Sequence, residues 1–347
     1  MQRKRHLLLG IVILLLFLIS CNRGKQVEKT KKALSNESLQ VKEVEDNFTQ
    51  RGSSGVWIAY WDLENTIEEA TMIYNSYDSI ALFAAYFDSS NQLFLPEELK
   101  GIREKLKNQL PDKNVYLTIV NDFLLSEGGS SLKDKELLKS VLANGDKADE
   151  LCNQIIAIAQ EVECDGIELD FEKVWNDTEF MDMYYDFVNK LKSKTEKPIR
   201  VLLEPSTPVS SLRFPSDIEY GVMCYNLHYT DADPGPKCDI QFLRDMIQKF
   251  QNTDNTMTFA LATGGFDFGD GKTVSITERQ AKELSMRYQC TPVRDEASKS
   301  LMFSYIVDGK EHEVWYADQE TLNEWKNTIQ SEGDDSVWIW RLGGNDF

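Results

Sequence analysis

From about residue 55 onward, short apolar runs alternate with segments in which apolar residues recur every three or four positions. Runs of this length are typical of buried strands, and the intervening spacing is typical of amphipathic helices. Eight such runs occur: VWIAYW (56–61), SIALFAAY (79–86), VYLTIV (115–120), GIELDF (166–171), IRVLLE (199–204), YGVMCY (220–225), MTFALA (257–262) and SVWIW (336–340). Strands that alternate with helices form parallel βαβ units, so eight of them predict an α/β fold, the closed (β/α)8 TIM barrel.

Two of the intervening segments also contain signals for the start of a helix. In DTEFMDMYYDFVNKLKSK (177–194) the apolar positions share one helix face, and Asp177 precedes them as an N-cap. Ser275 and Glu278 have the spacing of a capping box before the next helical pattern. Both signals support the alternation of strands with helices.

The segment between the seventh and eighth runs is too long for one helix. It contains LMFSYIVDGKEHEVWYAD (301–318), in which two alternating runs are joined by Asp308-Gly309, a dipeptide that favours a tight hairpin turn. We therefore expect a small α+β insertion between strands 7 and 8, at about 285–325, on the upper face of the barrel. It would form one wall of a cleft.

The first residues have the layout of an export signal, with a basic start, an apolar run and a small residue before Cys21. A transmembrane anchor is the alternative, but the run is short for crossing a bilayer. Because LISC resembles a bacterial lipobox, we expect a signal peptide at 1–20, lipidation of Cys21 and a flexible polar tether at 21–52. The folded domain would cover 53–347. This arrangement predicts a lipid-anchored protein of the bacterial cell envelope, outside the cytoplasmic membrane.

The formal net charge of −19 excludes nucleic acid and an anionic membrane surface as main partners, because both need a basic face. Membrane contact would come through the lipid alone. The cysteines after Cys21 have no zinc-type spacing, so we expect mostly buried thiols, with a Cys224–Cys238 bridge left open. We expect no metal, no cofactor and a monomer.

The stretch CDGIELDFE (164–172) places carboxylates at alternate positions of the fourth run. Alternation directs Glu168, Asp170 and Glu172 into the lumen, about 6.6 Å apart, and couples their ionisation. Like charges in a partly desolvated site raise at least one pKa, so that a glutamate can act as an acid near neutral pH. Glu172 lies at the carboxyl end, where barrels carry their chemistry. A solvated acidic face and a divalent-cation site are the alternatives.

At these residues a family resemblance appears. DGIELDFE resembles the DGxDxDxE signature that family 18 glycoside hydrolases, the chitinase family, carry on the fourth barrel strand; Asp170 and Glu172 match, whereas Glu168 replaces an aspartate. The segment 222–236 is similar to the sixth-strand MxYDxH…PGP motif of the branch that includes spore-cortex peptidoglycan N-acetylglucosaminidases. It matches at Met223, Tyr225 and His228, and Asn226 replaces an aspartate. HEVWYAD (312–318) resembles that branch's inserted-lobe motif, and SVWIWRLGGNDF (336–347) resembles the family's last strand, which puts Trp340 at the position of its sugar-platform tryptophan.

The resemblance implies substrate-assisted hydrolysis of β-1,4-linked N-acetylglucosamine in chitin-like or peptidoglycan glycans, with retention of configuration. Glu172 would be the acid and then the base, while the sugar's own acetamido group attacks the anomeric carbon. Asp170 would orient that group and Tyr225 would hydrogen-bond its carbonyl. Trp340 would be the floor under the sugar ring.

Further substrate contacts are expected from Glu168, Met223, Asn226, His228 and Tyr60. The main rival function is a non-catalytic, chitinase-like lectin on the same barrel, but members of this kind usually lack the terminal glutamate that Glu172 supplies. A structural lipoprotein with a decayed site is a third reading, motivated by Glu168 and Asn226.

Overall fold

The computed structural model describes residues 53–125, 128–209, 213, 215, 217–229, 232–251, 253, 255–334 and 336–347. The predicted signal peptide (1–20), Cys21 and the tether (21–52) lie outside these residues, so they stay predictions. Within the described part of the chain, no helix is both long and apolar enough to cross a membrane.

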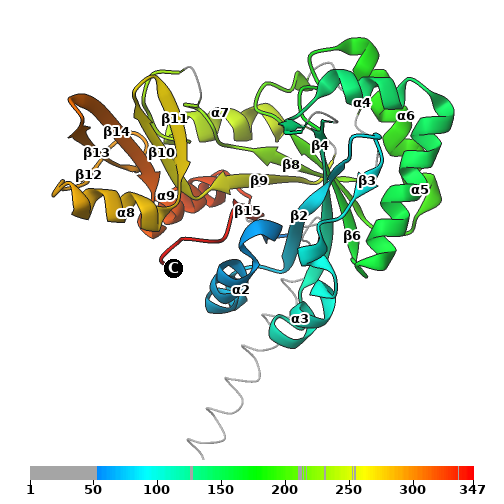
Figure 1. The fold of residues 1–347 in the computed structure, drawn as a ribbon, viewed down its shortest axis with the longest axis horizontal. Coiled ribbons are helices and arrows are strands. Elements are labelled where there is room, and N and C mark those ends of the chain that lie inside the picture. Colours follow the sequence, from blue (N-terminus) through cyan, green and yellow to red (C-terminus); the bar gives the residue numbers. More distant parts are fainter. Residues whose placement is uncertain are drawn as a thin grey trace, which may run out of the picture. The chain divides into compact units, whose positions relative to one another are not determined.

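Eight parallel strands form a closed ring (Figure 1). In order around the ring they are β1 (Gly55–Ala59), β2 (Ser79–Phe87), β4 (Asn114–Leu124), β6 (Gly166–Asp170), β7 (Ile199–Leu203), β8 (Glu219–Met223), β9 (Met257–Ala262) and β15 (Val337–Trp340). The last strand, β15, pairs with both β9 and β1 and so closes the ring. Each of the eight apolar runs is one of these strands, which confirms the predicted barrel.

Helices surround the ring and cover the outward faces of the strands. They are α2 (Leu63–Met72), α3 (Ile102–Gln109), α4 (Lys135–Leu142), α5 (Gly145–Glu161), α6 (Thr178–Lys194), α7 (Ile240–Phe250) and α9 (Gln319–Ser331). Short additions are β3 (Leu93–Phe94), β5 (Ser130–Ser131) and the 3-10 turns η2 (Tyr60–Asp62), η3 (Tyr74–Ser76) and η4 (Glu97–Leu99). Asp177 caps α6 as predicted, because its side chain accepts a hydrogen bond from Phe180 N at 3.1 Å.

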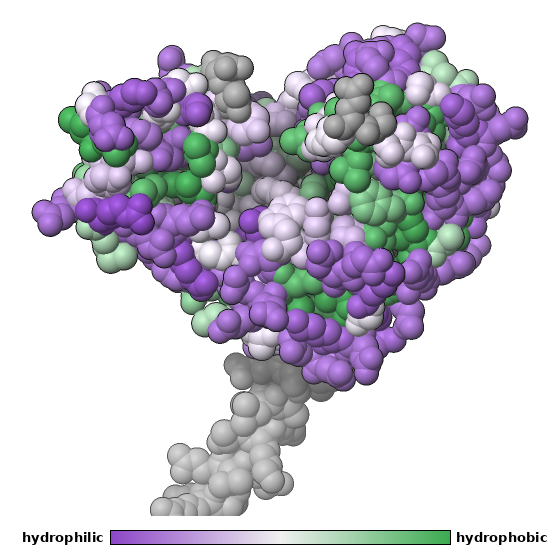
Figure 2. Space-filling view, in the orientation of Figure 1, coloured by the Kyte–Doolittle hydropathy of each residue, from purple (hydrophilic) through white to green (hydrophobic). Residues whose placement is uncertain are grey.

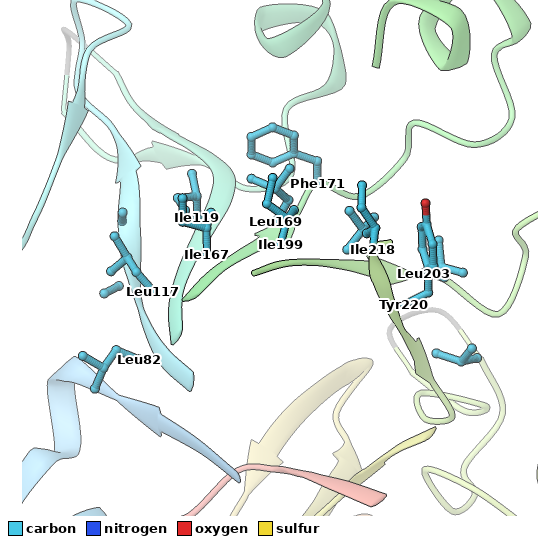
Figure 3. Packing of buried hydrophobic residues seen from close by; sticks show 14 of the residues in the cluster. Leu82, Leu117, Ile119, Ile167, Leu169, Phe171, Ile199, Leu203, Ile218 and Tyr220 are labelled. Atoms are coloured by element: carbon cyan, nitrogen blue, oxygen red, sulfur yellow. The ribbon is translucent and has the colours of Figure 1, made fainter. Parts of the chain in front are cut away.

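The main apolar core lies between the ring and these helices. Ile167, Leu169 and Phe171 point to this side from β6 and its end, beside Leu117 and Ile119 of β4 (Figure 3). Alternation therefore sends the other face of β6 into the lumen, as predicted. Cys152, Cys164, Cys224 and Cys238 are buried as free thiols, and Cys290 is a half-buried one, so the structure contains no Cys224–Cys238 bridge.

An antiparallel lobe is inserted between β9 and α9. Its elements are β10 (Gly264–Gly269), β11 (Lys272–Ile276), α8 (Glu278–Arg287), β12 (Val293–Arg294), β13 (Leu301–Val307) and β14 (Lys310–Ala317), in the sheet order β11-β10-β14-β13-β12. The Asp308-Gly309 hairpin is present, with φ angles of 51° and 75°. The lobe thus starts at Gly264 and ends before α9, whereas the sequence indicated about 285–325.

Two local expectations differ from the structure. The first apolar run ends as a strand at Ala59, and Tyr60 and Trp61 form a 3-10 turn. Ser275 lies in β11 and caps nothing; the capping box is Thr277 with Gln280, two residues later. At the start of the lobe Gly265 is required, because a Cβ there would lie 1.7 Å from Trp315 O on the neighbouring strand.

Candidate active site

Two carboxylates of the acidic strand meet at the carboxyl end of β6. The residue Asp170 is 5% exposed, and the side chain of Glu172 is 27% exposed just beyond the strand. Asn121, within neighbouring β4, fixes the backbone of Glu172. Its Oδ1 accepts from Glu172 N at 3.1 Å, and its Nδ2 donates to Glu172 O at 3.1 Å. This pair of contacts holds the glutamate at the mouth of the barrel.

Lys133 joins the two carboxylates. Its Nζ lies 2.6 Å from Asp170 Oδ2 and 3.0 Å from Glu172 Oε1. The residue follows β5 in a left-handed conformation, with φ of 53°, and its amide donates to Asp122 Oδ1 at 2.8 Å. An ammonium group therefore occupies the space between the carboxylates, where a divalent cation would have to bind.

Burial raises the pKa of Glu172 to about 7; Lys133 opposes this effect and Asp170 adds to it. Burial alone would lower the pKa of Lys133, but Asp170 and Glu172 outweigh it and hold that pKa above its usual value. A third carboxyl, Glu204 at the end of β7, has its pKa raised by burial and accepts from Lys173 N at 2.7 Å. Glu172 can thus exchange a proton near neutral pH.

One oxygen of Asp170 has no partner. Oδ2 binds Lys133, whereas Oδ1 is buried and accepts no hydrogen bond from any residue that the structure describes. A buried acceptor of this kind is costly unless something donates to it. The site therefore has an acceptor position ready for an N–H or O–H donor.

Glu168, predicted as a substrate contact, is instead part of the barrel floor. It is completely buried, forms an ion pair with Arg200 of β7, and accepts hydrogen bonds from Trp57 Nε1 and Thr118 Oγ1, both at 2.7 Å. Burial raises the pKa of Glu168, while Arg200 and the two donors act in the opposite direction. The expectation that Glu168 touches the sugar was wrong, because the side chain is fully buried and both of its oxygens already accept hydrogen bonds.

Arg200 connects this pair to the rest of the lumen. It also donates to Glu219 Oε1 and Thr258 Oγ1, each at 2.7 Å, and its guanidinium lies 3.8 Å from the ring centre of Trp338. The lower lumen is therefore filled by a network of charged side chains that packs against the Trp338 ring, rather than by layers of aliphatic side chains.

Aromatic side chains also pack inside the lumen. Met223 and Tyr225 are buried in one cluster with Trp57, Tyr116 and Trp338, and the half-buried Trp340 packs against it. Burial raises the pKa of Tyr225 well above its usual value, with Asp170 adding to the effect, so the phenol stays protonated as a donor. Trp340 meets Phe83 and Trp57 edge-on, at centroid distances of 4.7 and 6.0 Å.

Met223 is buried like Asp170 and Tyr225, and its contact with substrate stays a prediction, whereas Trp340 keeps part of its ring open. The view in Figure 2 is hollowed between the inserted lobe and the segments near α4, and pale, weakly hydropathic residues line that hollow. An aromatic floor beside a protonated phenol suits the apolar face and polar edge of a sugar ring.

The other predicted contacts lie at the rim. Tyr60 is half-buried, with its hydroxyl 3.4 Å from Tyr86 Oη. Asn226 is exposed, with a left-handed φ of 62° that asparagine tolerates. His228 Nδ1 lies 2.9 Å from Asp233 O, which ties the imidazole to its own loop. Substrate contact by these three residues stays a prediction.

Sequence reasoning missed Lys133, Asn121 and Glu204. Asn121 directly follows the third apolar run, and Glu204 ends the fifth, so the rule that barrel sites gather at strand ends could have found both. Lys133 carries no such signal, because a loop conformation brings it to the carboxylates.

Comparisons with known proteins agree with this architecture. No family model matches the chain. It is 24% identical over 246 residues to the sporulation-specific glycosylase YdhD of Bacillus subtilis, covering 65% of this chain and 56% of that protein. It is 23% identical over 319 residues to the uncharacterized glycosylase YvbX of the same organism, covering 84% and 88%. The chain thus spans little more than half the length of YdhD.

Solved structures show the same fold. The spore cortex-lytic enzyme SleL of Bacillus cereus matches with a TM-score of 0.69 and 18% identity, over 85% of this chain and 72% of that one. A class V chitinase from Nicotiana tobaccum matches with a TM-score of 0.66 and 13% identity, over 85% and 95%. At this level of identity the structures show the fold alone. Both sequence relatives are named glycosylases, one of them sporulation-specific, which agrees with the resemblance to the chitinase family and its spore-cortex branch.

Proposed function

We propose that this protein is a glycosidase that cleaves β-1,4 linkages of N-acetylglucosamine-containing glycans by a substrate-assisted, retaining mechanism. The unpartnered Oδ1 of buried Asp170 carries the proposal. The amide N–H of a 2-acetamido group is the donor that this acceptor lacks. Hydrogen bonding there would turn the acetamido carbonyl towards the anomeric carbon of the same sugar.

Glu172 supplies the proton. With a pKa of about 7, a substantial fraction of its carboxyl is protonated near neutrality, so it can protonate the glycosidic oxygen as that bond breaks. The acetamido oxygen forms the new bond to the anomeric carbon, giving an oxazolinium ion. The resulting Glu172 carboxylate then takes a proton from water, which opens the ring with overall retention.

Tyr225 and Trp340 position the reacting sugar. The buried, protonated phenol of Tyr225 donates to the acetamido oxygen as charge develops, and the open part of the Trp340 ring supports the sugar face. Glu168 acts only through the floor that it builds with Arg200.

Lys133 favours one alternative, a glycan-binding protein without turnover. Its ammonium forms ion pairs with both carboxylates, and an ammonium that stays there competes with the acetamido group. The hydrolase proposal therefore requires that Lys133 keeps Oδ2 of Asp170 and leaves Oδ1 to the substrate.

The test is release of product from a chromogenic N-acetylglucosamine oligomer by the wild-type protein and by Glu172→Gln. Glu136→Gln, at a site whose side chain is 80% exposed on α4, is the matched control. We expect turnover by wild type and control and its loss in Glu172→Gln, with the β-anomer formed first in an NMR time course. Binding of the oligomer without turnover would support the lectin instead, and an initial α-anomer would exclude the retaining mechanism.

The natural glycan can be identified by digesting purified peptidoglycan, chitin oligomers and a high-mannose glycopeptide in parallel. Mass analysis of the products shows which of the three is cleaved. The lipid anchor at Cys21 and an envelope location outside the cytoplasmic membrane are further proposals that rest on the sequence. Incorporation of labelled palmitate, and its loss in Cys21→Ser, would test them.

A further inference from the structure

A cavity of about 330 Å³ lies where the inserted lobe meets the rim of the barrel, directly beside Trp340. Lys237, Thr263, Trp340 and Arg341 line it from the barrel side, and Thr277 and Gln280 line it from the lobe. We propose that this cavity binds the carboxylate of an acidic substituent on the glycan, next to the sugar ring on Trp340. The inference rests on the proposed function, because it assumes that Trp340 carries a sugar.

Lys237 is the main reason. The residue is 9% exposed, and its Nζ donates to Thr263 O at 2.9 Å and lies 4.9 Å from the ring centre of Phe266. No carboxylate among the described residues lies within salt-bridge distance of this ammonium. A buried cation without an anionic partner is costly, and an anionic ligand would remove that cost.

Arg341 adds a second positive charge. Its Nη1 donates to Leu342 O at 2.9 Å and lies 3.5 Å from Asp62 Oδ2, and the guanidinium lies 5.3 Å from the ring centre of Trp61. Among the lining residues Asp62 is the one carboxylate, and its Oδ1 also accepts a hydrogen bond from Asn65 Nδ2 at 2.7 Å. Two cations against one anion leave the cavity with a net positive charge.

This positive cavity stands out in a chain whose net charge is −19. At physiological ionic strength, charges more than about 8 Å away are largely screened, so the nearest groups decide which ligand is attracted. Thr277 and Gln280 add neutral hydrogen-bonding groups to the lining of the cavity. The combination suits a carboxylate rather than a neutral hydroxymethyl group.

Burial and the charge of Arg341 lower the pKa of Lys237 to about 8. The ammonium is therefore present at neutral pH and is lost as the pH rises through that value. Among the lining residues the charged groups that face it are Arg341 and Asp62. Affinity for an acidic ligand should accordingly fall above about pH 8, and affinity for a neutral one should not.

The experiment is calorimetric binding to full-length Glu172→Gln protein, in which turnover does not interfere. The ligands are a tetrasaccharide of N-acetylglucosamine, one with alternating N-acetylmuramic acid, the methyl ester of the latter, and one with alternating glucuronic acid. We expect an acidic ligand to bind about tenfold or more tightly than the neutral ones, because charged hydrogen bonds are the strong ones. The two acidic ligands separate a lactyl carboxylate from a uronate.

Two variants test whether the preference for acidic ligands arises in this cavity. Lys237→Met removes the cation, and Gln280→Glu adds a negative charge at the cavity while keeping the capping box of α8, which accepts either residue at that position. Gln319→Glu, also exposed in the first turn of a helix, is the matched control. If Lys237→Met fails to fold, Gln280→Glu carries the test.

The preference for the acidic ligand should fall towards unity in Lys237→Met and Gln280→Glu and persist in Gln319→Glu. Equal affinities in the parent protein, or a preference that survives both cavity variants, would overturn the inference. Lack of turnover by the wild-type protein would refute the hydrolase proposal and leave this binding preference standing. Failure to bind any of the ligands would overturn both.

Discussion

Replacing Lys133 by methionine should move the alkaline limb of the pH–rate profile to higher pH. In the structure the ammonium lies 3.0 Å from Glu172 Oε1 and lowers the pKa of that carboxyl, which burial and Asp170 raise to about 7. A general acid works only while it is protonated, so kcat/KM should be lost as the pH rises through the pKa of Glu172. Without Lys133 the pKa of Glu172 rises, so kcat/KM is lost only at a higher pH.

The size of the change follows from the geometry. At 3.0 Å two unit charges attract by about 1.4 kcal/mol even in the dielectric of bulk water, which is equivalent to a change of about one in the pKa. Both side chains are less than a third exposed, so the effective dielectric is lower and the effect larger. Opposite charges at such distances typically change a carboxyl pKa by about 1 to 3. The limb should therefore move from about pH 7 to about pH 8 or above.

The assay is kcat/KM for a chromogenic N-acetylglucosamine oligomer between pH 4 and 10. Lys133→Arg retains the charge and should leave the limb near its original position. Lys135→Met is the matched control, because this lysine lies on the same segment but pairs with Asp177 and Glu136 rather than with the site. A Lys133→Met profile with an unchanged limb would refute the reasoning, since Lys133 would then not be acting on the acid.

Three further outcomes are expected. Arg200→Met should lower the free energy of unfolding by about 3 to 5 kcal/mol in urea denaturation, because Glu168 would remain as a buried, unpaired charge; a loss below about 1 kcal/mol would contradict this. Tyr225→Phe should lower kcat by about 100-fold with little change in Tm, whereas an equal rise in KM would mean that the phenol only binds substrate. Glu69→Gln should destabilise the protein by about 1.5 to 3 kcal/mol in the same denaturation assay, because the Glu69 carboxylate accepts the backbone N–H groups of Gly343 and Asn345; unchanged stability would argue against that anchor.

The barrel was predictable because its strands are covered on both faces. Such strands are continuous apolar runs, and all eight stand out against the helical spacing between them. The lobe was only partly predictable. Its first strand, GGFDFG, has glycine at three of six positions, which weakens the strand pattern, and close approach to β14 admits no side chain at Gly265.

Within the candidate site, strand alternation predicts that each acidic side chain points into the lumen, but it does not predict how far each one lies from the mouth of the barrel. Glu168 points into the lumen as expected. It is in register with Arg200 on the adjacent strand, and the two side chains form a buried ion pair. The lone arginine in IRVLLE was a signal for that partner. Lys133 could not be predicted, because its place depends on a left-handed loop conformation that no periodicity encodes.

The pairing of β15 with β1 also has a consequence for biosynthesis. The two strands lie nearly 280 residues apart, and the ring stays open until residues 337–340 have left the ribosome. Until then β1 and β9 each keep one unsatisfied edge, and an emerging chain with such edges can pair with its neighbours. We therefore expect nascent chains that stop before β15 to aggregate, and we expect a holding chaperone to be most useful until β15 has been synthesised.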